Sequence, residues 1–195
     1  AGDVARLGAF GRDTGDNLAG LHLVAVAVAL PLAARAQHNH ASPAPGAYVG
    51  LDSRPVKALS PDQLADLRAG RGMGLALPAE LNGYPGPTHV LELAGPLGLT
   101  PEQRARTESL VSAMRAEAIP LGERLIADET ALDRLFADKQ ATAGTLDAAT
   151  AQVGATQAAL RAAHLRYHLE MVAVLPPEQV ARYAALRGYG GAHRP

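Results

Sequence analysis

Cysteine and tryptophan are absent from this 195-residue chain, and only two phenylalanines and five tyrosines are present. The absence of cysteine excludes disulfides, thiolate metal sites and cysteine nucleophiles, so histidine, methionine and carboxylate side chains remain as the available metal ligands. Because alanine and leucine supply most of the apolar surface, the composition favours helices packed on helices over a β-sandwich. The chain is long enough to bury the core of one domain with extensions.

Charge and recognisable catalytic motifs are also scarce. The formal net charge is −1 and no basic stripe with interleaved aromatics occurs, so we expect no nucleic-acid partner. The motifs G-x-S-x-G and H-E-x-x-H and paired carboxylates are missing, which predicts a protein that is not an enzyme. The segment Gly70-Arg71-Gly72-Met73-Gly74 resembles a phosphate-binding loop, but no strand precedes it, and we predict no nucleotide.

An apolar run at residues 21–33 has the character of a signal-peptide core. It is well short of the ~20 residues that a transmembrane helix needs. The small residues of Ala34-Arg35-Ala36 directly after it form an A-x-A cleavage site, which predicts a mature chain that starts at Gln37 and lies in the periplasm. The segment before the run lacks a basic n-region, which leaves the start of the reading frame open, and an uncleaved membrane tether is the alternative. Residues 1–36 are therefore interpreted as a leader.

The remaining chain divides by composition into three parts. Residues 37–88 form a Pro/Gly-rich arm in which the spacing predicts one short helix, from Ser60 to Ala69. Residues 89–188 carry helical periodicity, and residues 189–195 form a loose tail. The predicted fold is all-α: a long antiparallel helical hairpin with short flanking helices, preceded by the arm.

The hairpin prediction rests on two apolar seams. The first follows a helix from Pro101 to about Lys139, with a bend expected at Pro120, and contains Leu110, Met114, Leu121, Leu125, Leu132 and Phe136. A turn at residues 141–145 leads to the second, which contains Leu146, Val153, Leu160, His164, Tyr167, Met171 and Val174. Two long helices joined by a short loop pack antiparallel. A last helix is expected from Pro177 to Arg187.

A helix-start box occurs three times in nearly the same form. Its copies are Leu59-Ser60-Pro61-Asp62-Gln63, Leu99-Thr100-Pro101-Glu102-Gln103 and Leu175-Pro176-Pro177-Glu178-Gln179. In the first two, Ser or Thr caps the helix, Pro occupies its first turn, and Gln can complete a capping box. The third copy lacks the hydroxyl. Each box alone is explained by ordinary capping, whereas two that bracket a long hairpin are more specific.

With these boxes the chain resembles the Spy/CpxP family of periplasmic proteins, which includes the ZraP/CnrX heavy-metal-resistance branch and is marked by Leu-Thr-x-x-Gln boxes. The matching residues are Leu99, Thr100, Gln103, Leu175 and Gln179. The resemblance implies a four-helix protomer in an antiparallel homodimer with a concave client-binding face. It also implies a role as an ATP-independent chaperone, an envelope-stress modulator or a metal sensor.

Two groups of histidines are candidate metal ligands. His164 and His168 are one helical turn apart, Met171 follows on the same side, and antiparallel registry is expected to bring Glu108 opposite the pair. Imidazole and thioether donors suit Cu, Ni, Co or Zn. The alternative is that His164 is a hydrogen-bonded core residue and His168 a solvated one. His38 and His40 form a second pair, interpreted either as polar filler or as a weak, labile metal site.

Three functions remain open from the sequence. The first is a periplasmic chaperone or stress protein that binds unfolded or regulatory envelope proteins without nucleotide. The second is a metal-binding sensor or resistance protein that uses His164, His168 and Met171, with a dimer partner as a source of further ligands. The third is a structural envelope protein that docks a partner through the arm around residues 80–87.

Overall fold

The computed structural model describes residues 46–189. The predicted leader, its cleavage site and the pair His38 and His40 lie outside this range. Within it the secondary structure is entirely helical, which confirms the predicted fold class. The elements are η1 (Leu51–Ser53), α1 (Pro61–Arg68), α2 (Leu77–Glu80), α3 (Pro87–Glu92), α4 (Ala94–Leu97), α5 (Pro101–Ala137), α6 (Ala143–Val172) and α7 (Pro177–Leu186). None of the helices in this range is long and apolar enough to cross a membrane.

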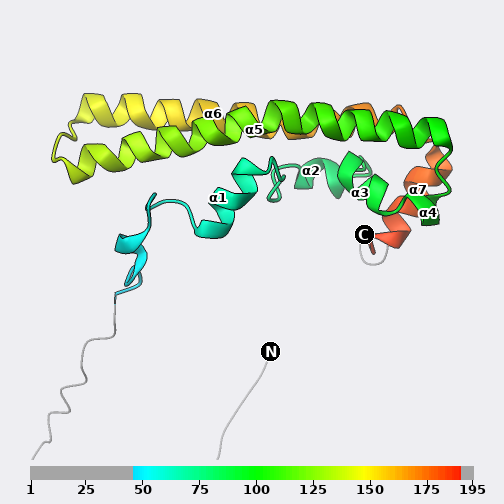
Figure 1. Ribbon diagram of the computed structural model, residues 1–195, viewed down its shortest axis with the longest axis horizontal. Coiled ribbons are helices and arrows are strands. Elements are labelled where there is room, and N and C mark those ends of the chain that lie inside the picture. The colour runs from blue at the N-terminus through cyan, green and yellow to red at the C-terminus, as the bar shows by residue number, and fades with distance from the viewer. Residues whose placement is uncertain (1–45, 190–195) are drawn as a thin grey trace, which may run out of the picture. The chain divides into compact units, whose positions relative to one another are not determined.

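Helices α5 and α6 form the long hairpin, and they run side by side in Figure 1. Helix α5 continues through Pro120 without interruption. It ends where Lys139 adopts a left-handed conformation, with φ of 59°, and α6 then begins at a capping box made by Thr142 and Thr145. The two antiparallel helices are joined by side-chain contacts at several points along their length, for example by the hydrogen bond of 2.6 Å that Thr156 donates to Asp128.

The segment before the hairpin packs onto it. Leu64 and Leu67 of α1 are buried in one apolar cluster with residues of α5 and α6 such as Leu125 and Leu160. The backbones approach closely at Gly122, where a Cβ atom would lie only 2.4 Å from the carbonyl oxygen of Leu67. A second cluster joins α3, α4 and α7 to the other end of the hairpin. The boundary between arm and hairpin, expected at residues 88 and 89, falls inside α3.

One end of the predicted seam is not buried. Phe136, near the tip of the hairpin, is 53% exposed, so its assignment to the apolar seam was wrong. The cause is geometric. Helix α1 packs on α5 and α6 in the middle of the hairpin and helps to bury their apolar side chains. It does not extend to the tip, where two helices alone cannot enclose a large side chain.

Two of the repeated glutamines join the ends of four helices. Gln103 completes the capping box of Thr100, and its Nε2 also donates to Val174 and, at 2.7 Å, to Gln179. Gln179 in turn donates to the carbonyl oxygen of Leu97 at 3.2 Å. These bonds tie the start of α5 to the end of α6, the start of α7 and the end of α4.

This arrangement predicts unequal effects for two glutamines that occupy the same place in their boxes. Gln103→Ala should lower the free energy of unfolding by about 1–3 kcal/mol, because it removes the side-chain half of the capping box and leaves partly buried partners unpaired. Gln63→Ala removes only the capping bond to Ser60 and should cost less than about 1 kcal/mol. Denaturant unfolding of both variants measures the difference, and equal losses would show that the bonds to Val174 and Gln179 contribute nothing.

Candidate metal centre

His164 is a buried side chain with an unsatisfied nitrogen. It is 2% exposed, and among the described residues its Nε2 finds no hydrogen-bond partner. Burial lowers the pKa of His164, the neighbouring His168 lowers it further, and Glu117 opposes the shift only in part. The ring is therefore neutral at neutral pH. An unpaired buried polar atom costs about 1–3 kcal/mol, so its presence calls for a function or a bound partner.

His168 lies one turn further along α6 and is oriented by the arm. Its Nδ1 is 2.7 Å from the carbonyl oxygen of Tyr84, and because a carbonyl only accepts, Nδ1 carries the proton. In this tautomer Nε2 holds the lone pair. Metal-binding histidines are commonly fixed in this way, with one ring nitrogen donating to a backbone carbonyl and the other free for the ion.

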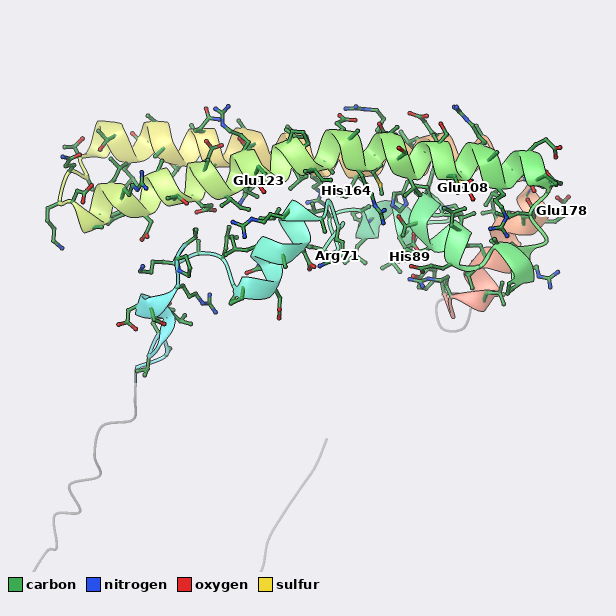
Figure 2. All side chains as sticks on the ribbon, viewed as in Figure 1. Arg71, His89, Glu108, Glu123, His164 and Glu178 are labelled. Atoms are coloured by element: carbon green, nitrogen blue, oxygen red, sulfur yellow. The ribbon has the colours of Figure 1, made fainter. Side chains whose placement is uncertain are left out.

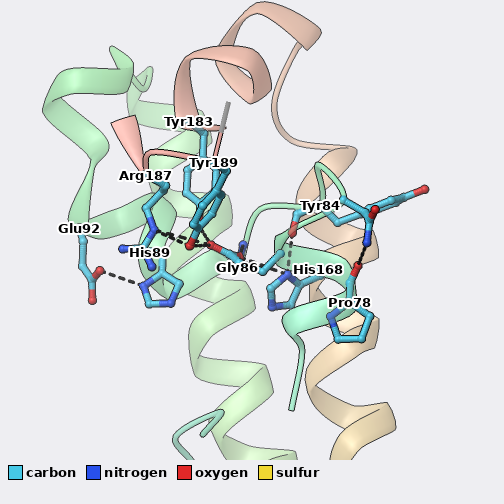
Figure 3. Close-up of polar contacts among 11 residues, drawn as sticks. Pro78, Tyr84, Gly86, His89, Glu92, His168, Tyr183, Arg187 and Tyr189 are labelled. Carbon is cyan, nitrogen blue, oxygen red and sulfur yellow. Dashed lines mark hydrogen bonds and ion pairs between the residues drawn. The ribbon is translucent and has the colours of Figure 1, made fainter. Parts of the chain in front are cut away.

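A buried carboxylate, Glu80, connects His168 to the C-terminal helix. Figure 3 labels its partners Gly86, His168, Tyr183, Arg187 and Tyr189. Glu80 accepts hydrogen bonds from the hydroxyls of Tyr183 and Tyr189 and, at 3.0 Å, from the backbone N–H of Gly86. The Nδ1 of His168 and the Nε of Arg187 are each 3.7 Å from its oxygens. Burial and the bond to Glu80 raise the pKa of Tyr183, which remains a protonated donor. The Glu80 cluster therefore holds α2, α7 and the His168 ring in fixed relation.

Both histidines open onto a cavity of about 540 Å³ between the arm and the hairpin. The arm approaches the rings through glycines. A Cβ atom on Gly72 would lie 3.6 Å from Nδ1 of His164, and one on Gly86 would lie 2.9 Å from Cε1 of His168. The cavity is also lined by Met73, Met114, Glu80, His89 and Glu92. Figure 2 labels His164 on the hairpin, Arg71 of the glycine loop and His89 of α3, all of which line this cavity.

Two of the predicted ligands are placed away from this cavity. Met171 is fully buried in the apolar cluster with Tyr167 and Tyr183, and it belongs to the core. Glu108 was expected to approach His168, but it does not line the cavity. The registry is close to the predicted one, since Arg106 pairs with Glu170, but Glu108 lies on the exposed face of α5 whereas the ring of His168 points toward the arm.

The donors around the cavity fit a metal ion only in part. In residues 46–189 no group of three or more histidine, aspartate or glutamate side chains is arranged to hold an ion. Two imidazoles nevertheless line one cavity, and one of them has a buried nitrogen without a partner among the described residues. These residues can supply two nitrogen ligands, which is a fit for a borderline or soft transition metal and a poor fit for a hard cation.

Sequence analysis missed Glu80 as a residue of this region. Its tyrosine partners are more than a hundred positions away, and a single glutamate in a Pro/Gly-rich segment gives no periodic or motif signal. The pair of histidines was visible because helical spacing alone places residues four apart on one face.

These features describe a helical-hairpin protein with a buried histidine pair beneath a packed N-terminal segment. A family model described as heavy-metal resistance matches residues 72–182, which is more than half of the chain. The chain therefore belongs to the heavy-metal-resistance family, and the resemblance inferred from the Leu-Thr-x-x-Gln boxes is confirmed at the level of the family. The match extends from the glycine loop into α7 and thus includes both histidines. No curated protein and no solved structure matches the chain.

Proposed function

We propose that this chain is an exported protein that binds a transition metal through His164 and His168 and acts by binding rather than by catalysis. The observation that carries the proposal is the buried, unpaired Nε2 of His164 beside a cavity. A core histidine without function would be expected to have a hydrogen-bond partner. The family assignment supports metal resistance in general, and the apolar run followed by Ala34-Arg35-Ala36 supports export.

The two histidines would act as nitrogen ligands, each in the neutral form that coordination requires. The carbonyl of Tyr84 holds His168 in the tautomer that leaves Nε2 free. The Glu80 cluster fixes the ring against rotation, and the backbone at Gly72 and Gly86 limits access of solvent to the pair. A bound metal ion would be the partner that the buried Nε2 of His164 lacks.

A second function, that of a chaperone-like envelope protein, has separate support. A groove of about 450 Å³ lies between α1 and the hairpin. Its lining includes five leucines, Met73 and Ala158, together with the polar residues Gln63, Gln157 and Arg161. An apolar groove of this kind suits a hydrophobic segment of an unfolded or regulatory protein. It shares Met73 with the histidine cavity.

Calorimetric titration of the full chain with Cu, Ni, Co and Zn ions tests the metal proposal. We expect stoichiometric binding of at least one of them below micromolar concentration, and a loss of about 100-fold or more in affinity for the double variant His164→Ala/His168→Ala. The matched control is His38→Ala/His40→Ala, which should retain the tight site. Loss of binding in the control instead would refute the proposal. Suppression of client aggregation, measured on the same variants, should not follow metal affinity if the groove acts separately.

A further inference from the structure

The carboxylates at the histidine cavity are already engaged by other groups. Glu80 accepts three hydrogen bonds, from Tyr183, Tyr189 and the backbone of Gly86. The other two carboxylates each have a cationic or imidazole partner, Asp66 with Arg71 at 2.6 Å and Glu92 with His89 at 3.0 Å. An ion in the cavity would therefore compete with these contacts for an oxygen ligand. The nitrogen and sulfur donors that line the cavity are the imidazoles of His89, His164 and His168 and the thioethers of two methionines.

Sulfur is unevenly distributed around the hairpin. The chain has three methionines, and two of them, Met73 and Met114, line the cavity together with His164 and His168. Met114 comes from α5 and is buried, while Met73 comes from the glycine loop between α1 and α2 and is 40% exposed. The third, Met171, is fully buried in the apolar cluster that also contains Met114, but unlike Met114 it does not line the cavity.

The loop that carries Met73 is held in an unusual conformation. Met73 has a φ of 43°, a left-handed value that costs energy for any residue with a Cβ atom. Gly70 packs against Ala118 and Ile119 of α5, and Gly72 packs against His164, so the loop lies across the groove beside the histidine. Strain of this kind persists when surrounding contacts impose it, and it concentrates at binding sites.

We propose that this site, which rests on the function proposed above, is selective for a soft monovalent ion, Cu(I) or Ag(I), with Met73 and Met114 as thioether ligands beside His164 and His168. The four donors are neutral, so they offer no charge compensation to a divalent ion. Thioether sulfur prefers Cu(I) to the harder Ni(II), Co(II) or Zn(II). The glycine loop then has a function of its own, because it brings a ligand from the arm to a site on the hairpin.

Competition with a coloured Cu(I) chelator under anaerobic, reducing conditions tests the inference on the full chain. Met73→Leu and Met114→Leu should each weaken Cu(I) binding by about 10-fold or more, whereas Met171→Leu, the matched control in the core, should leave it unchanged. Leucine and methionine have similar volumes, so all three variants should keep the fold, which circular dichroism checks. X-ray absorption of the Cu(I) complex should show both sulfur and nitrogen neighbours.

The outcomes distinguish this inference from the function on which it rests. If Zn(II) or Ni(II) binds more tightly than Cu(I), or if both cavity methionine variants keep the Cu(I) affinity of the wild type, the thioether site is wrong while the histidine site stands. If the wild type binds none of these ions, or if His164→Ala/His168→Ala changes nothing, both proposals are wrong.

Discussion

Replacing His164 by leucine is expected to raise the stability of the metal-free protein and, at the same time, to remove its metal binding. Leucine has a similar size and carries no polar atom, so it relieves the burial of an unpaired Nε2, which costs about 1–3 kcal/mol. For a domain of this size each kcal/mol corresponds to roughly 2–4 °C in melting temperature. Metal affinity should fall by at least about 100-fold, because a ligand is lost.

The opposite signs of the two effects are what make the variant informative. If His164 were instead a hydrogen-bonded core residue with no metal role, its replacement by leucine would lower the stability of the protein and leave metal binding unaffected. His89→Leu is the control, since His89 lines the same cavity but is half-buried and paired with Glu92. It should give no gain in stability. Differential scanning calorimetry with and without metal measures both quantities, and a lower melting temperature for metal-free His164→Leu would contradict the interpretation.

Gly122→Ala is expected to destabilise the protein although it replaces glycine inside a helix. In an exposed helix this change gains about 1 kcal/mol from helix propensity. Here the new Cβ would lie 2.4 Å from the carbonyl oxygen of Leu67 and 2.9 Å from its carbonyl carbon. Backbone atoms cannot rotate away as a side chain can, so α1 must shift and lose packing against the hairpin. We expect a net loss of about 1–3 kcal/mol.

Gly154→Ala provides the matched control for this substitution. Gly154 is exposed in the middle of α6, and a Cβ there meets nothing within 4 Å. The variant should therefore be stabilised by up to about 1 kcal/mol. Urea unfolding of both proteins gives the comparison. Equal stabilisation of the two variants would show that α1 does not pack on α5 at this point. The proposed position of the glycine loop, which follows α1 directly, would then also be in question.

The hairpin could be predicted from the sequence because its signals are local. Thr100 and Gln103 specify where α5 begins, and the seam from Leu110 to Leu125 repeats at helical spacing. Periodicity does not report how many helices surround each position, and for this reason Phe136 was assigned to a seam that is open at the tip. Family membership was likewise accessible, since the boxes are short contiguous motifs.

The surroundings of the histidines could not be predicted to the same depth. The spacing of His164 and His168 places them on one face, but which element covers that face depends on contacts across 80 residues or more, such as the bond from His168 to Tyr84. Glu108 was chosen by registry, and registry fixes the height along a helix without fixing the direction of the side chain. The arm, which composition describes as irregular, in fact contributes Glu80, Gly86 and Met73 to the cavity.

Nitrogen NMR of the full chain, with isotopically labelled histidine rings, tests most directly whether His164 and His168 bind the metal. The chain has seven histidines, and the ring signals of these two can be assigned from the variants. On addition of stoichiometric Cu(I), which is diamagnetic, the Nε2 signals of His164 and His168 should shift together while the other rings keep their positions. Shifts confined to His38 and His40, with the signals of His164 and His168 unchanged, would contradict a metal centre beneath the arm.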